Sequence, residues 1–170
     1  MPELPEVETI CLQLHQVVLG ARILETQIID PKLGGIPGLE EREVLVIKRY
    51  GKALKMEMEG GLKLLIHFRM TGRLLWEEGD SIPSHVRLVL SFPQGRVLFI
   101  DPRRFGTFSV QQNGELPLLG GDPLEDLKSS QLWEVSRKSS LPIKSFLMDQ
   151  RRIAGIGNIY ACEILHQAHI

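Results

Sequence analysis

The chain has only two cysteines, Cys11 and Cys162, among its 170 residues. Two cysteines form neither a disulfide framework nor a four-cysteine metal site, and no Cys-x-x-Cys pair is present, so we expect free, mostly buried thiols. No apolar run approaches the roughly 20 residues that a membrane-spanning helix requires, so we expect no membrane association. The acidic, proline-rich start over residues 1–6 lacks the features of a secretory signal peptide. These absences favour a cytoplasmic protein.

An excess of positive charge is also missing. The 20 lysines and arginines are balanced by 21 aspartates and glutamates, which argues weakly against nucleic-acid binding. The positive charges are nevertheless clustered, in the pair Arg103-Arg104 and in residues 137–152, where Asp149 is the only acidic side chain. Such clusters can hold phosphates, although a near-neutral chain attracts DNA little over long distances, and taken alone they are more often solvated surface.

Apolar residues make up 43% of the chain, which is sufficient for a hydrophobic core. Over residues 5–18 they recur with helical spacing, at positions 7, 10, 11, 14, 17 and 18. Pro5 suits the first helical position, where its missing N–H has no cost, and Gly20 ends the pattern. We therefore predict an N-terminal helix with one buried stripe.

Between about residues 22 and 110 the apolar period changes to two. Alternating segments at 44–46, 54–58 and 62–70, with Gly60-Gly61 as a turn, are followed by 86–92 and 97–99, joined at 93–95. Several such strands with short turns indicate an antiparallel sandwich or barrel. The proline- and glycine-rich segment 31–40 is predicted to be a loop.

Residues 113–123 have the composition of a linker, and helical patterns follow at about 124–136, around 143–147 and from 159 onward. Ile170 lies inside a helical pattern without a stop signal, so we expect a fragment of a longer protein. The predicted fold class is α+β: an N-terminal helix on an antiparallel β-sandwich, followed by helices.

Pro2 is the first candidate for chemistry. It is a small second residue, so we expect removal of Met1, which leaves a secondary amine. A model α-amino group titrates at about pH 7.7–8.0, so part of it is nucleophilic near neutrality and can form an iminium. Glu3 and Glu6 could shuttle protons beside it. Taken alone, Pro2 simply starts a chain, and the two glutamates equally suit helix-start electrostatics.

Residues 1–9, MPELPEVET, resemble the opening signature of the formamidopyrimidine-DNA glycosylase family, whereas its endonuclease VIII relatives typically have glycine in place of Leu4. The resemblance continues through HFRMTG at 67–72, DPRRFG at 101–106 and GIGNIYA at 155–161. Shorter matches lie between them, LG at 119–120, PL at 123–124, IK at 143–144 and LMD at 147–149. The matches therefore cover the whole chain in order.

This resemblance implies a catalytic β-sandwich domain over residues 1–112, a linker over 113–130 and a truncated helix-two-turn-helix domain over 131–170. It implies a monomeric DNA glycosylase and abasic-site lyase that acts on damaged double-stranded DNA. The substrates would be oxidised purines, 8-oxoguanine and formamidopyrimidines, with strand nicking by β/δ-elimination. No cofactor is expected in this chain. In the full-length family a C-terminal zinc finger is expected, and its four cysteines are absent here.

The resemblance also implies roles for individual residues. Pro2 would attack C1′ of the damaged nucleoside and form a Schiff base. Glu3 would transfer protons during base loss and ring opening, and Glu6 would orient Glu3 or a water. Lys52, on a loop between strands, would contact phosphate and assist elimination. Without the resemblance, Lys52 would be an ordinary exposed hairpin lysine.

Met70, Arg103 and Phe105 match the family's trio that fills the void left by an extruded nucleotide. Considered alone, Met70 and Phe105 would be assigned to the core. Asn158, in a turn whose glycines and free helix N–H groups suit a phosphate, and Lys144 are predicted to contact DNA. Their alternatives are a helix N-cap for Asn158 and solvated surface for Lys144.

Pro83 stands where the family commonly has a phosphate-contacting histidine, and we expect the neighbouring His85 to be mainly structural.

Two other functions remain open. The chain could be a truncated, inactive DNA-binding fragment of such an enzyme. It could also be a small-molecule enzyme that uses its N-terminal proline as a base, as tautomerases do, although Met70, Arg103 and Phe105 would then be unexplained.

Overall fold

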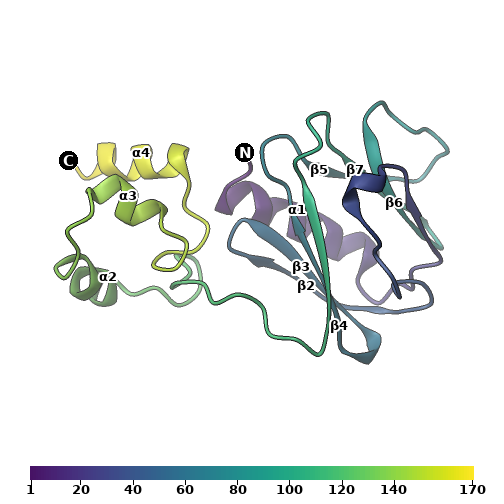
Figure 1. The fold of residues 1–170 in the computed structure, drawn as a ribbon, viewed down its shortest axis with the longest axis horizontal. Coiled ribbons are helices and arrows are strands. Elements are labelled where there is room, and N and C mark those ends of the chain that lie inside the picture. The colour runs from purple at the N-terminus through teal and green to yellow at the C-terminus, as the bar shows by residue number, and fades with distance from the viewer.

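Helix α1, Leu4–Val18, begins one residue earlier than predicted, so Pro5 lies in its second position. The backbone N–H of Glu3, which has no partner within the helix, donates to the Glu6 carboxylate at 2.9 Å. The predicted stripe is confirmed, and its most buried members are Val7, Cys11, Leu14 and Val18. The computed structural model describes residues 1–170 and places this helix along the sandwich (Figure 1).

Eight strands form two four-stranded antiparallel sheets, which confirms the predicted sandwich. One sheet has the order β1-β6-β7-β5, and the other has the order β2-β3-β4-β8. The strands are β1 Glu25–Ile28, β2 Val44–Tyr50, β3 Ala53–Met58, β4 Leu62–His67, β5 Arg73–Glu77, β6 Val86–Phe92, β7 Gly95–Ile100 and β8 Thr107–Gln112. The turn at Gly60-Gly61 is confirmed and belongs to a short 3-10 helix, Glu59–Gly61, between β3 and β4.

The prediction that the strand around residue 66 continues to Met70 was wrong. Strand β4 ends at His67, and the N–H of Gly72 donates to the carbonyl of Phe68 at 2.9 Å, which closes a turn. Arg69 in this turn has a positive φ of 54°. The apolar alternation runs on past the end of the strand because Phe68 is still buried, whereas Met70 is exposed. The predicted loop at 31–40 also begins with a 3-10 turn, Pro31–Leu33.

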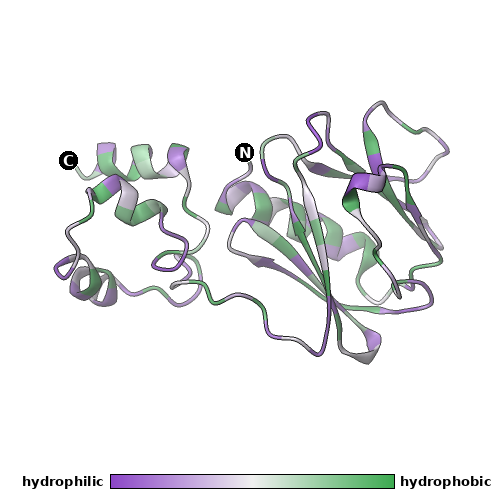
Figure 2. Cartoon of the chain, viewed as in Figure 1, coloured by the Kyte–Doolittle hydropathy of each residue, from purple (hydrophilic) through white to green (hydrophobic).

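The main core lies between the two sheets and the inner face of α1, and apolar segments line it (Figure 2). It contains 21 buried residues, whereas the helical lobe has a separate cluster of five. That smaller cluster consists of Phe146, Leu147, Ile153, Ile156 and Ala161. None of the helices is long and apolar enough to cross a bilayer.

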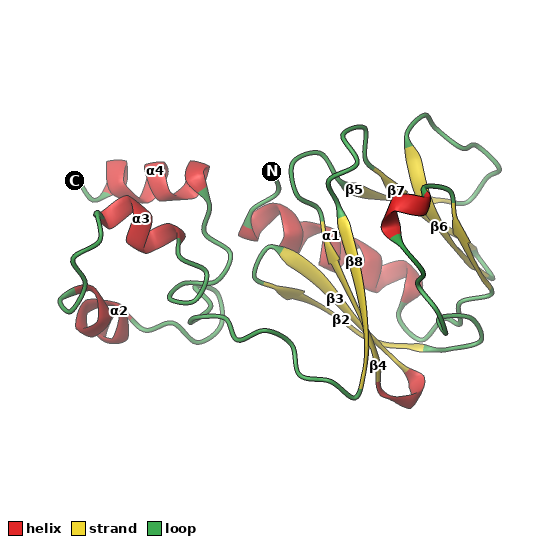
Figure 3. Cartoon of the chain, in the orientation of Figure 1, coloured by secondary structure: helices red, strands yellow, loops and turns green.

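The helical lobe contains α2 Ser129–Ser136, α3 Ile143–Met148 and α4 Asn158–Gln167 (Figure 3). The helix predicted over 124–136 was wrong at its start. The carbonyl of Asp122 accepts from the N–H groups of Glu125, Asp126 and Leu127, so this stretch forms a compact turn before α2 begins.

The two lobes are joined by an ion cluster around the buried Arg49 side chain. The Arg49 side chain on β2 is 2% exposed and pairs with Glu8 on α1 at 2.9 Å and with Asp122 at 2.6 Å. A second link is the N–H of Leu4, which donates to the carbonyl of Gly155 at 3.0 Å. Because a buried charge that loses a partner is costly, this cluster holds the chain start against the helical lobe.

Candidate active site

Glu3 connects the chain start to the first turn of α4. Its side chain is buried, and Oε2 accepts from the backbone N–H groups of Gly157 at 2.8 Å and Tyr160 at 3.2 Å. Oε1 accepts from the N–H of Ile159 at 3.0 Å. A carboxylate is stabilised at a helix start, where N–H groups lack partners within the helix. Glu3 therefore caps the N-terminus of α4, although it lies 154 residues before Gly157 in the chain.

The glycines before α4 make room for this contact. A Cβ on Gly157 would collide with the Glu3 carboxylate, and one on Gly155, whose φ is +86°, would lie 2.8 Å from Cβ of Leu4. The prediction that this helix start presents free N–H groups to a phosphate was wrong, since three of them donate to Glu3. The alternative role of Asn158 as N-cap was also wrong, because Gly157 is the N-cap and Asn158 is an exposed first helical residue.

Glu6 supports the same arrangement from the first turn of α1. Its Oε2 accepts from the Glu3 N–H at 2.9 Å, and its Oε1 accepts from the Tyr160 hydroxyl at 3.1 Å. Glu6 therefore orients the backbone beside Pro2, which is itself partly buried. Sequence reasoning missed Tyr160, although it lies within the string at 155–161, because only the docking of α4 brings its hydroxyl to Glu6.

Lys52 reaches this junction from the turn between β2 and β3. An ideal Cβ on Gly51 would lie 3.7 Å from the backbone nitrogen of Gly155, so the turn lies against the loop that receives Leu4. Lys52 is half-buried. Burial lowers the pKa of its ammonium, and the nearby Glu3 carboxylate opposes this shift. The structure thus brings Lys52 to the residues of the chain start, and the interpretation as an ordinary exposed hairpin lysine does not hold.

A cavity of about 190 Å³ opens beside Lys52 and is lined also by His67, Leu119 and Gln150. His67 Nδ1 accepts from the Arg69 N–H at 3.1 Å, which leaves the proton of the neutral ring on Nε2. Burial, with Arg69 and Lys52, lowers the pKa of His67 to about 4, so the ring is neutral at pH 7. Sequence reasoning did not select His67, although it belongs to the string at 67–72.

Met70, Arg103 and Phe105 form a second group on exposed loops. Met70 is 48% exposed and Phe105 is 46% exposed, so the alternative that they belong to the core is wrong. The guanidinium carbon of Arg103 lies 4.8 Å from the centroid of the Phe105 ring, a cation–π arrangement. His67 lines the Lys52 cavity and lies three residues before Met70, so the chain runs directly from this cavity into the Met70 turn.

Two further candidates lie on the helical lobe, and one of them, Asn158, stands between two residues whose N–H groups bind Glu3. Lys144 is partly exposed on α3, and Asn158 is exposed at the start of α4. Neither side chain forms an ion pair within the chain. Their assignment to DNA contact remains a prediction.

The residues present do not fit a four-cysteine zinc site. Cys11 is buried in α1, where burial raises the pKa of its thiol to about 12, and Cys162 is exposed on α4. The expectation of mostly buried thiols is therefore wrong for Cys162. No three His, Cys, Asp or Glu side chains are grouped closely enough to hold a metal ion.

Comparison with known families gives two matches along the chain. Residues 1–108 match the formamidopyrimidine-DNA glycosylase N-terminal domain, and residues 119–170 match the formamidopyrimidine-DNA glycosylase H2TH domain. Curated relatives named formamidopyrimidine-DNA glycosylase include those of Dinoroseobacter shibae, 39% identical over 100% of this chain and 68% of the relative, and Solibacter usitatus, 40% identical over 100% and 66%. The chain thus spans about two thirds of their length.

Solved structures show the same fold. A Lactococcus lactis Fpg in complex with DNA containing an abasic site has a TM-score of 0.90 at 32% identity, covering 99% of this chain and 67% of that one. A G226P mutant of the same protein in complex with DNA containing Fapy-dG has a TM-score of 0.91 at 32% identity, covering 99% and 68%.

Proposed function

Because the chain belongs to the formamidopyrimidine-DNA glycosylase family, we propose that it excises oxidised purines, 8-oxoguanine and formamidopyrimidines, from duplex DNA and then nicks the strand. The observation that carries this proposal is that Glu3, the residue after Pro2, binds Glu6 and the start of α4 and lies near Lys52 at the junction of the two lobes. The DNA in the complexes of the Lactococcus lactis protein, with an abasic site or Fapy-dG, supports the substrate class.

The proposed reaction begins with the Pro2 nitrogen, freed by removal of Met1. The amine adds to C1′ of the damaged nucleoside, the bond from C1′ to the base breaks, and the base leaves with a proton. Loss of the amine proton and cleavage of the C1′–O4′ bond then give an iminium, with a proton delivered to O4′. Glu3, which is one residue from the nucleophile and is held by the start of α4, would move these protons.

Strand cleavage follows from the iminium, which acidifies the C2′ hydrogens. Removal of one C2′ proton expels the 3′ phosphate by β-elimination, and a second elimination expels the 5′ phosphate. Lys52, half-buried beside Glu3, would contact the departing phosphate as a cation. Water then hydrolyses the iminium and restores the amine.

Chemistry at C1′ requires the nucleotide to leave the base stack, which costs a few kcal/mol. Met70, Arg103 and Phe105 supply an apolar wedge, a hydrogen-bonding cation and a stacking ring, all exposed. Inserted into the void, they would offset that cost. Lys144 and Asn158 would contact the phosphates on either side.

Borohydride trapping tests the proposal, because it reduces the iminium to a stable tertiary amine that links Pro2 to C1′. The chain should form a covalent adduct with duplex DNA containing 8-oxoguanine or an abasic site, and none with undamaged duplex. The second candidate is a DNA-binding protein without catalysis, which is favoured by the three backbone N–H groups on the Glu3 carboxylate, because a carboxylate held in this way can serve as a helix cap alone. Under that alternative, a shift of damaged DNA on a gel at low salt would occur without any trapped adduct.

Replacing Lys52 with alanine should slow strand nicking about tenfold, the effect of losing one charge-assisted contact, while base release falls by less. Nicking and base release are measured on the same duplex, with alkali used to reveal every abasic site. The control is Lys48→Ala, which removes an exposed lysine of β2 with the same change in charge. Equal nicking rates for the parent and Lys52→Ala would remove Lys52 from the mechanism.

A further inference from the structure

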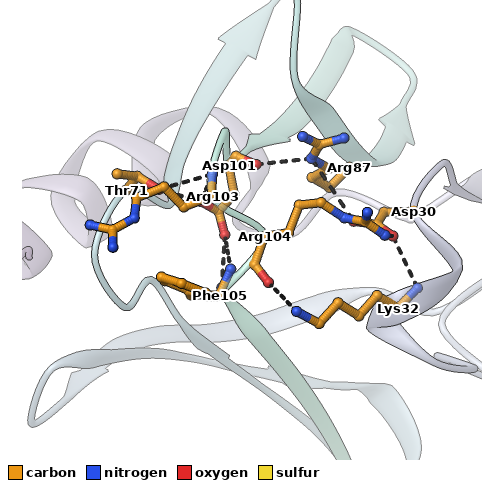
Figure 4. Close-up of polar contacts among 9 residues, drawn as sticks. Asp30, Lys32, Thr71, Arg87, Asp101, Arg103, Arg104 and Phe105 are labelled. Atoms are coloured by element: carbon orange, nitrogen blue, oxygen red, sulfur yellow. Dashed lines mark hydrogen bonds and ion pairs between the residues drawn. The ribbon is translucent and has the colours of Figure 1, made fainter.

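Two separate loops carry the three side chains proposed to enter DNA. Met70 lies in the turn at residues 69–71, whereas Arg103 and Phe105 lie in the loop at 102–106. The loops follow different strands, β4 and β7, which belong to different sheets. To fill one void together, the two loops must keep a fixed position relative to each other. The contacts around Asp101 fix this position (Figure 4).

The Asp101 carboxylate binds both loops at once. Its Oδ1 accepts from the Thr71 hydroxyl at 2.5 Å and from the Arg103 N–H at 3.2 Å. Its Oδ2 accepts from the N–H groups of Phe105 at 2.8 Å and Gly106 at 2.7 Å. A carboxylate has about four lone-pair sites, so these four donors saturate it. Asp101 is also fully buried, which leaves it no access to substrate.

The two loops also rest on the same aromatic ring. A Cβ on Gly72 would lie 3.0 Å from Cε2 of Phe99, and a Cβ on Gly106 would collide with Cζ of the same ring. Phe99 is completely buried on β7. Both glycines therefore let their loops pack directly onto one rigid element of the core.

A second clamp fixes the outer side of the loop at 102–106. Arg104 has a positive φ of 59°, a conformation that costs energy for a residue with a side chain. Its guanidinium makes two hydrogen bonds of 2.6 Å with the buried Asp30 carboxylate, and its carbonyl accepts from the Lys32 ammonium at 3.0 Å. The hydrogen bond with Arg104 is the main cause that lowers the pKa of Asp30 to about 2. The loop is thus held by Asp101 through the backbone of three residues and by Asp30 through the side chain of Arg104, and the Thr71 hydroxyl joins the Met70 turn to it.

We propose that Asp101, acting through the Thr71 hydroxyl, is a positioning residue that couples the two loops into one unit for insertion into DNA. This inference rests on the proposed function, because it assigns a role within base extrusion. Two loops that move separately would each lose conformational entropy on entering the duplex. A coupled pair is already ordered in the free protein, so its insertion has a lower entropic cost.

The test compares Thr71→Val, which keeps the shape and removes the hydroxyl, with Thr71→Ser, which keeps the hydroxyl. Thr71→Val should excise 8-oxoguanine from duplex DNA roughly tenfold more slowly than the parent, and Thr71→Ser should match the parent. Both variants should trap at the parent rate on single-stranded DNA with an abasic site, because no opposite strand leaves a void to fill. Normal excision by Thr71→Val from the duplex would overturn the proposal.

Amide hydrogen exchange on the free chain supplies a readout that needs no DNA. In Thr71→Val the segments 69–72 and 102–106 should lose protection together, and in Thr71→Ser neither should. Faster exchange confined to 69–72 would show that the loops are not coupled and would also overturn the proposal. If the parent chain fails to trap on any DNA, the proposed enzyme function fails, while the exchange measurement still decides whether the loops are coupled.

Discussion

Replacing Pro2 with glycine is expected to slow borohydride trapping on abasic-site DNA by about 100-fold, the scale of loss seen when a reacting group is misplaced by about 1 Å. Glycine leaves a primary amine, whose Schiff base can lose its N–H proton and become a neutral imine, whereas the Schiff base of proline has no such proton and stays cationic. It also removes the ring that restricts φ at this position. In the structure Pro2 is partly buried next to Glu3, whose N–H and carboxylate are both held, so the loss of the ring affects an otherwise fixed site.

The matched control for this experiment is Pro5→Ala. Pro5 lies in the second position of α1, where alanine is well tolerated, and it belongs to the same short segment. Intact mass must show that Met1 has been removed from the parent and from both variants before the rates are compared. A Pro2→Gly chain that traps as fast as the parent would show that the N-terminal ring nitrogen has no special role.

Replacing Glu3 with glutamine should reduce 8-oxoguanine release by about 100-fold to 10,000-fold, the range for losing a positioned proton-transfer group. Glutamine has the same shape but turns an NH₂ group toward the N–H groups of Gly157, Ile159 and Tyr160. The lost charge-assisted hydrogen bonds should also lower the free energy of unfolding by about 1.5–3 kcal/mol. Glu3 therefore combines a structural role with the proposed chemical one, and the experiment must separate them.

The separation comes from comparing two substrates below the unfolding transition. A preformed abasic site has no base to lose, and its sugar already populates the open aldehyde, so Glu3→Gln should impair trapping there much less than 8-oxoguanine release. Glu134→Gln, on the exposed surface of α2, is the control for the change in charge. An equal loss on both substrates would identify Glu3 as a helix cap without a part in proton transfer.

Local patterns were enough to predict most of the secondary structure. The stripe of α1 and the alternation in β2, β3, β4, β6 and β7 follow from periods of 3.6 and two, which are properties of short segments. The strands β1, β5 and β8 were not individually predicted, because none of their residues is buried and their apolar alternation is therefore weak. Residue type and family resemblance, which the amino-acid sequence alone contains, predicted the candidates Pro2, Glu3, Glu6 and Lys52.

The contacts that make these candidates into a site come from the docking of distant segments. The Glu3 carboxylate accepts from three backbone N–H groups at the start of α4. Every residue except proline has such a group, so residue type does not reveal which of them Glu3 binds. The same holds for Asp101, whose carboxylate takes three of its four donors from backbone N–H groups. Met70 likewise continues an apolar alternation and is nevertheless exposed, because a hydrogen bond at Gly72 ends the strand first. Backbone partners carry no sequence signature, so such contacts emerge only once the lobes and sheets have packed.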